Sequence, residues 1–183
     1  MRIIGGSQRG FLFKTPKGVH VRPTTDMIRE ALFNILQPVS GKTFLDIFAG
    51  TGGVGMEALS RGAAQVVFLE KKMTLVRSIW DLAKELSYEH KVNVVSSDVK
   101  KGIPQVAELD IEFDNVFLDP PYQRGLIEDT ITRIGEAGLI GENSVMVVQH
   151  SKREPVRVTH EKFIIEQQRK YGDSMLTFIK IKS

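Results

Sequence analysis

The sequence contains no cysteine, which excludes disulfides, thiolate metal sites and a cysteine nucleophile. It also contains no apolar run near the ~18 residues that a transmembrane helix needs. Its first six residues lack the apolar core of a signal peptide. The lack of cysteine fits a reducing compartment, and neither a transmembrane helix nor a signal peptide is indicated. We therefore expect a cytoplasmic protein.

The chain has 183 residues, enough for one domain of roughly 150 residues with a short appendage. Hydrophobic residues make up 42% and charged residues 26%, as in ordinary globular proteins, which excludes disorder, collagen or coiled coil as a description of the whole chain. The sequence shows no internal repeat. We therefore expect a basic arm over residues 1–22 and a single folded domain over residues 23–183.

Charge is unevenly distributed although the net charge is only +3. Residues 1–25 hold five basic residues and no acid, residues 151–183 hold eight basic and four acidic residues, and the segment between them holds twelve basic and eighteen acidic residues. An acidic body between basic ends suggests that the ends meet an anionic partner. A solvated surface with chance clustering is the alternative interpretation.

From residue 43 onward, short apolar runs alternate with amphipathic segments. The apolar runs at 44–49, 66–69, 92–95, 116–118 and 145–148 predict buried strands, and the segments at 56–60, 74–86 and 126–137 predict helices. An earlier helix is expected to begin near residue 24 or 25 and to end before Pro38. Continuous apolar strands alternating with helices predict a mostly parallel sheet that is covered on both faces.

The two ends of the chain follow a different pattern. The apolar runs 163–165 and 175–179 flank a turn at Gly172-Asp173, which predicts an antiparallel hairpin. The arm reads as a β-hairpin or an irregular extension, with short apolar runs around the glycine-rich residues 5–10. The predicted fold is therefore α/β, with a seven-stranded Rossmann-like sheet, a C-terminal antiparallel hairpin and a small N-terminal hairpin.

A glycine motif lies where the first strand of the sheet should meet its helix. Gly50, Gly52 and Gly55 form the pattern Gly-x-Gly-x-x-Gly, in which glycine permits a tight turn and close approach to a ligand. Glu70 ends the next strand, where a carboxylate can accept hydrogen bonds from both ribose hydroxyls. The pattern indicates a nucleoside cofactor, with a merely structural turn as the alternative. Asp46 either orders this loop or is an ordinary acid at a strand end.

A second motif, Asp119-Pro120-Pro121-Tyr122, follows the fourth predicted strand. The prolines stiffen the turn and lack N–H groups, so the motif presents acceptors: the Asp119 carboxylate and a backbone carbonyl. Tyr122 adds a ring on which a planar base can stack. Two acceptors and a stacking face suit a nucleobase with an exocyclic amine. A rigid turn with a capping aspartate is the alternative.

Ser97-Asp98 follows the third predicted strand. The carboxyl ends of parallel strands meet at one sheet edge, which would place Asp98 near an adenine amine. An N-cap for a following helix is an equally good interpretation.

In this order, Asp46 to Gly55, Glu70, Asp98 and Asp119 to Tyr122 resemble the class I S-adenosylmethionine-dependent methyltransferases. The Asp-Pro-Pro-Tyr form resembles members that methylate exocyclic amines. Further segments resemble the RsmD family, whose members make N2-methylguanine in bacterial 16S ribosomal RNA; these are residues 5–10, 22–26, 29–34, 60–63 and 170–173. The resemblance extends over the whole chain.

The resemblance implies S-adenosylmethionine as cofactor, S-adenosylhomocysteine as product and no metal. It implies 16S ribosomal RNA or a small-subunit particle as partner. No membrane partner is expected because the chain has no long apolar run, and a monomer is the default expectation. The implied cofactor residues are Asp46, Phe48, Gly50, Thr51, Gly52, Gly53, Glu70, Lys71, Asp98, Val99 and Asp119, with Arg22 and Thr25 as further candidates at the border.

The implied catalytic residues are Asp119, Pro120, Pro121 and Tyr122, where Asp119 and the Pro120 carbonyl accept hydrogen bonds from the substrate amine. The RNA contacts are expected from Arg2, Arg9, Lys14, Lys17, Arg22 and Tyr122. Phe11 and Phe13 are interpreted as hairpin core rather than as stacking platforms.

The sequence departs from the family pattern at two positions. Met27 stands where a basic residue is usual, which removes a phosphate contact, and Gln149 stands where a glutamate is usual. His150 is interpreted as structural rather than catalytic.

Other functions remain open at this point. Methylation of adenine N6 or of a protein amide uses similar proline-rich motifs, and a non-catalytic assembly factor that binds RNA would keep the same fold. A nicotinamide dehydrogenase would explain the glycine motif but would leave residues 119–122 without a role.

Overall fold

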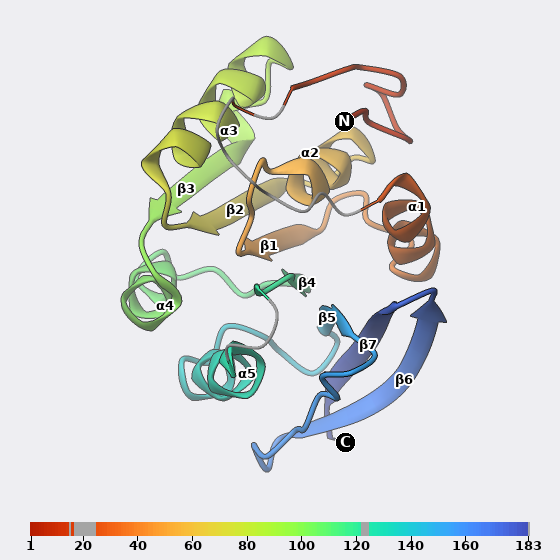
Figure 1. The fold of residues 1–183 in the computed structure, drawn as a ribbon. Helices are drawn as coiled ribbons and strands as arrows, with labels where there is room; N and C mark the ends of the chain where they lie inside the picture. Colours follow the sequence, from red (N-terminus) through yellow and green to blue (C-terminus); the bar gives the residue numbers. More distant parts are fainter. Residues whose placement is uncertain (15, 17–24, 122–124, 183) are drawn as a thin grey trace.

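The structure is a computed structural model that describes residues 1–14, 16, 25–121 and 125–182. Figure 1 shows a central sheet with helices on both sides. The elements run α1 (Asp26–Ile35), β1 (Thr43–Ile47), α2 (Gly53–Ser60), β2 (Gln65–Glu70), α3 (Met73–Glu85), a 3-10 turn η1 (Glu89–Lys91), β3 (Val92–Ser96), α4 (Val99–Ala107), β4 (Asn115–Leu118), α5 (Leu126–Glu136), β5 (Val145–Ser151), β6 (Phe163–Tyr171) and β7 (Ser174–Ile181).

The sheet has seven strands in the order β3-β2-β1-β4-β5-β7-β6. Strands β1 to β5 pair in parallel, whereas β7 pairs antiparallel with both β5 and β6. The predicted parallel sheet and C-terminal hairpin are therefore confirmed. The register aligns Ile47 of β1 with Leu69 of β2 and Leu118 of β4, so these three strands end together and bring the loops that follow them to one edge.

Two hydrophobic cores sandwich the sheet, because successive side chains on a strand point to opposite faces. Phe44 and Phe117 pack into the core beneath α1, α2 and α3. Leu45 and Val116 pack into the core beneath α4 and α5. Both faces of the sheet are thus buried, which explains why the strand sequences are continuous apolar runs.

The first helix begins where the sequence predicts. Thr25 is the N-cap residue, and its Oγ1 accepts a hydrogen bond from the Ile28 N–H at 3.3 Å. Asp26 occupies the first turn, where a negative charge interacts favourably with the helix dipole.

The N-terminal segment is an irregular hairpin with one β-bridge, between Arg2 and Leu12. The Ile3 N–H donates to the Phe11 carbonyl at 3.0 Å, and Ile3 and Phe13 are buried in the core beside α2. The interpretation of Phe13 as core is confirmed, and Phe11 packs partly buried against the same core. This segment also explains why every residue of α2 is buried, since it covers the outer side of that helix.

Helix α4 was not among the helices predicted from apolar periodicity, although an N-cap at Asp98 was one of the two interpretations of that residue. It contains Pro104 and Gly102, two residues that disfavour a helix interior. Asp98 caps this helix by accepting a hydrogen bond from the Lys101 N–H at 3.1 Å. Across the described part of the chain, no helix has both the length and the apolar character needed to cross a membrane.

Candidate active site

A cavity of about 540 Å³ opens at the carboxyl ends of the parallel strands. Its lining includes most of the predicted site residues: Asp46, Phe48, Gly50, Thr51, Gly53, Glu70, Lys71, Asp98, Val99, Asp119, Pro120 and Pro121. They come from the ends of β1 to β4, which the sheet order places side by side. The structure thus brings together residues that lie more than 70 positions apart in the chain.

The loop between β1 and α2 turns sharply beneath this cavity. Phe48 has a φ of 62°, a conformation that non-glycine residues rarely adopt and that is found at functional sites. Gly50 and Gly52 also have positive φ, at 58° and 77°. Gly52 is the N-cap residue of α2 and is not among the lining residues, unlike the other predicted loop positions.

Glu70 is buried at the end of β2 and is held by two backbone groups. The Gly50 N–H donates to Glu70 Oε2 at 2.9 Å, and the Lys72 N–H donates to Oε1 at 2.9 Å. A carboxylate has acceptor capacity beyond two hydrogen bonds, so these contacts orient it without exhausting it. Glu70 therefore fixes the glycine loop and still offers acceptors to a diol.

Asp46 lies buried on β1, where its Oδ2 accepts a hydrogen bond from the Gly55 N–H at 2.9 Å. This bond satisfies a free donor in the first turn of α2 and confirms that Asp46 orders the loop. Burial raises the pKa of Asp46 well above its ordinary value, the bond from Gly55 opposes that rise, and the nearby charges of Asp119 and Glu70 add to it. The cavity floor is thus a cluster of carboxylates that repel one another.

The second motif follows β4, and its Asp119 belongs to this cluster. Asp119 is half-buried and Pro120 is buried, and both line the cavity with Pro121. The Asp119 N–H approaches the Ile47 carbonyl at 3.5 Å, which ties the motif to the end of β1. Tyr122, which we predicted to stack on the base, lies outside the described residues.

The N-cap interpretation of Asp98 is confirmed, whereas its place near an adenine amine stays a prediction. Asp98 caps α4 through Oδ1, and it also lines the cavity on the side of β3. Lys71 and Val99 also line the cavity, and their contact with a cofactor stays a prediction.

The predicted RNA contacts lie on the N-terminal segment. Arg2, Arg9 and Lys14 are exposed, and Arg2 Nε forms an ion pair with Asp26 at 2.8 Å. Lys17 and Arg22 lie outside the described residues. Thr25 caps α1 and is not among the residues that line the cavity.

The sequence analysis missed several polar or polarisable lining residues: Met1, Lys72, Ser97, Lys100 and Asp129. Asp129 lies in the first turn of α5 and pairs with Arg133 at 2.9 Å. Met1 reaches the cavity through the packing of the N-terminal hairpin, which no local pattern signals.

The positions that depart from the family pattern lie elsewhere. Met27 is 59% exposed on α1, and Gln149 is buried on β5. His150 is buried and its Nε2 lies 2.7 Å from Thr177 Oγ1, in keeping with a structural role. Among the described residues, no group of three acidic or histidine side chains is placed to hold a metal ion.

Comparison with known proteins settles the family. A family model described as conserved hypothetical protein 95 matches residues 1–180. The chain belongs to this family. Ribosomal RNA small subunit methyltransferase D of Escherichia coli K12 is 36% identical over 154 residues, which cover 81% of this chain and 74% of the relative. The match confirms the resemblance to the RsmD family that the motifs predicted.

Solved structures confirm the fold of the family. The Escherichia coli protein yhhF superposes with a TM-score of 0.87 at 28% identity, over 100% of this chain and 98% of that protein. A structure complexed with S-adenosylhomocysteine superposes with a TM-score of 0.67 at 14% identity, over 85% of this chain and 48% of its own. At that identity the likeness shows a shared fold alone.

Proposed function

We propose that the protein methylates the exocyclic N2 amine of a guanine in 16S ribosomal RNA, with S-adenosylmethionine as methyl donor. The observation that carries this proposal is the meeting of the glycine loop, Glu70 and residues 119–121 in one cavity. The relative named as a ribosomal RNA methyltransferase supports the reaction and the class of substrate. The choice of guanine N2 rests on the family resemblance and on the acceptors after β4.

The donor set of the cavity fits S-adenosylmethionine. Asp46, Glu70 and Asp119 concentrate negative charge, which a cationic ligand relieves. S-adenosylmethionine carries a sulfonium and an ammonium group, and when bound it supplies an electrophilic methyl group. Glu70, at the end of β2, is assigned to the ribose hydroxyls. Asp98 follows the neighbouring strand β3 at the same edge of the sheet, and we assign it to the adenine amine.

Asp119 and the Pro120 carbonyl are assigned to the substrate amine. The lone pair of a guanine amine is delocalised into the ring, which makes it a poor nucleophile. Acceptors that bind its hydrogens favour a pyramidal nitrogen and direct its lone pair at the methyl group. The proton can leave after transfer, so the site needs no strong base. Well-held reactants save ~7–11 kcal/mol of the barrier, and we assign most of the catalysis to such positioning.

The basic N-terminal segment is proposed to contact the phosphate backbone through Arg2, Arg9 and Lys14, with Lys17 and Arg22 continuing the charge along the sequence. Phosphate contacts give affinity and orientation but do not read sequence. We therefore propose that a small-subunit assembly particle, rather than naked RNA, presents the target to a monomeric cytoplasmic enzyme.

The test supplies purified protein and labelled S-adenosylmethionine to small subunits that lack their N2-methylguanines. Naked 16S RNA runs in parallel, and nucleoside analysis follows. We expect labelled N2-methylguanosine from the particle and little from naked RNA. Label on N6-methyladenosine or on protein would replace the proposed substrate, and no label despite binding of S-adenosylhomocysteine would favour a non-catalytic assembly factor.

A further inference from the structure

We propose that the N-terminal arm, here residues 1–14, forms a wall of the cofactor pocket and positions the amino-acid end of the cofactor. The proposal rests on the proposed function for the identity of the ligand. It adds a second role to a segment whose charge alone suggested contact with RNA.

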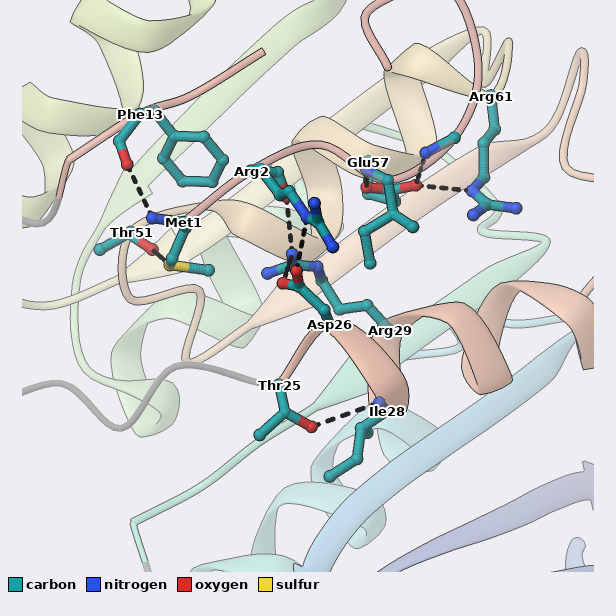
Figure 2. Close-up of polar contacts among 12 residues, drawn as sticks. Met1, Arg2, Phe13, Thr25, Asp26, Ile28, Arg29, Thr51, Glu57 and Arg61 are labelled. Atoms are coloured by element: carbon teal, nitrogen blue, oxygen red, sulfur yellow. Dashed lines mark hydrogen bonds and ion pairs between the residues drawn. The ribbon is translucent and has the colours of Figure 1, made fainter. Parts of the chain in front are cut away.

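The arm reaches the cavity through Met1, which is one of its lining residues. Figure 2 shows Met1 beside Thr51. The Thr51 hydroxyl donates to Met1 Sδ at 3.3 Å. A Cβ added at Gly53 would lie 2.6 Å from Met1 Cε and 3.5 Å from Phe13 Cζ, so both side chains lie against the first residue of α2. The arm therefore touches the glycine loop and the start of α2, and Met1 forms part of the cavity lining.

The arm is held in this place by buried polar groups of α2. Glu57, which is fully buried, accepts hydrogen bonds from the Ile4 and Gly5 N–H groups, each at 2.7 Å (Figure 2). Ser60 Oγ donates to the Gly5 carbonyl at 2.6 Å and accepts from the Gln8 N–H at 2.9 Å. A carboxylate that accepts two backbone donors in a dry site fixes them firmly.

A buried cation secures the arm from the other side. Arg29 of α1 has no exposed surface, and its Nη2 donates to the Arg2 carbonyl and to Asp26 Oδ1, both at 2.7 Å (Figure 2). Its Nη1 lies 3.5 Å from the Cβ position of Gly53. The arm, α1 and the start of α2 thus form one connected unit beside the cavity.

The strand order identifies the part of the cofactor that faces Met1. Asp98 follows β3 and Glu70 ends β2, so adenine and ribose are assigned to that side of the cavity. Asp119 follows β4, on the other side of β1, where methyl transfer is assigned. The amino-acid portion must lie near the turn from β1 into α2, which is where Met1 packs against Thr51 and Gly53.

Two glycines of the arm provide a matched pair of variants. Gly6 has a φ of 77°, and an added Cβ would lie 1.8 Å from the Ser60 carbonyl oxygen, so Gly6→Ala must push the arm away from α2. Gly10 has a similar φ of 90° but has open space around it. Gly10→Ala therefore imposes the same kind of backbone strain without displacing the arm.

Calorimetry would compare S-adenosylhomocysteine with 5′-methylthioadenosine, which lacks the amino-acid portion. We expect Gly6→Ala to weaken S-adenosylhomocysteine about tenfold and to leave 5′-methylthioadenosine within about twofold, whereas Gly10→Ala changes neither beyond that margin. Ser60→Ala is a milder change that removes the Oγ hydrogen bonds to Gly5 and Gln8. It should show a smaller effect of the same kind and guards against loss of folding in Gly6→Ala.

Hydrogen exchange on the wild-type protein provides an independent measure. Because coupling is reciprocal, S-adenosylhomocysteine should slow exchange of the Ile4 and Gly5 amides. Equal loss of both ligands, or unchanged binding with a displaced arm, would overturn the inference. Failure of the wild-type protein to bind S-adenosylhomocysteine would overturn the proposed function as well.

Discussion

Asp46 is a buried carboxyl group whose pKa is raised by burial and by its acidic neighbours. A bound sulfonium stabilises the charged form and lowers that pKa, so binding releases a proton. The affinity for S-adenosylmethionine should therefore rise with pH through the raised pKa of Asp46 and level off above it. Calorimetry in buffers of different ionisation enthalpy measures the release.

The Asp46→Asn variant should lose this proton release, whereas the exposed control Asp81→Asn should keep it. Equal release by wild type and Asp46→Asn would assign the titration to another group.

Asp119 is predicted to act on the substrate rather than on cofactor affinity. Asp119→Asn keeps the size of the side chain but replaces one acceptor oxygen by a donor. We expect kcat to fall about 100-fold or more. Loss of one preorganised hydrogen-bonding group that stabilises charge in a transition state has an effect of this size. Affinity for S-adenosylhomocysteine should stay within about threefold. Turnover near the wild-type rate would show that the substrate amine binds elsewhere.

The sequence predicted the residues of the cavity that belong to local motifs. Glu70 and Asp119 could be found because parallel strands end at one edge, so a residue at the end of an apolar run has a known place. Met1 could not be found in this way, because it reaches the cavity through tertiary packing of a segment that forms a single β-bridge. The packing of a residue distant in sequence leaves no periodic signal.

Among the secondary-structure elements, β1 and β4 are tied together by Asp114 at their starts. Burial alone would raise the pKa of Asp114, but hydrogen bonds from Lys42 Nζ and from the Thr43 N–H and hydroxyl outweigh it and hold the pKa below its usual value. A lowered pKa contributes stability above the ordinary pKa of an aspartate, and this stability is lost as the pH falls through the folded-state value.

Asp114→Asn should therefore lower the free energy of unfolding at pH 7 by about 1–3 kcal/mol, toward the lower end because Lys42 and Asp114 are partly exposed. The difference from wild type should shrink below about pH 4. Urea unfolding at several pH values measures it, with Asp81→Asn as control. A difference that does not change with pH would assign the effect to packing instead of charge.

Helix α4, whose start was indicated only by one interpretation of Asp98, shows the limit of predicting a helix from intrinsic propensity. Gly102 is disfavoured in a helix, yet an added Cβ there would lie 2.3 Å from Leu69 Cδ1, so the close approach of α4 to β2 requires glycine. Pro104 lacks an N–H group but lies late in a short helix that Asp98 caps. The packing of α4 against the sheet thus outweighs the low helix propensity of Gly102 and Pro104.

The whole molecule combines an acidic cavity with exposed cations at its N-terminal end. Each phosphate contact releases counterions, so the slope of log affinity against log salt concentration should fall by about 0.7–0.9 for every contact removed. We expect Arg9→Ala and Lys14→Ala each to reduce the slope of log RNA affinity against log salt concentration by this amount. Lys84→Ala, on α3, should leave the slope unchanged. Fluorescence anisotropy at several salt concentrations measures the slopes, and equal slopes would place the RNA on another face.

The docking of the first residues onto α2 also sets an order of events during synthesis. Ile4 and Gly5 bond to Glu57 across 53 and 52 positions of the chain. At roughly 5–20 residues per second, a ribosome needs several seconds to make that stretch. Residues 4 and 5 must therefore wait for their docking helix, and closing so long a loop is slow compared with forming local helices. Ile4 and Gly5 are consequently made several seconds before the helix that holds them, so the proposed pocket wall cannot form until α2 has emerged.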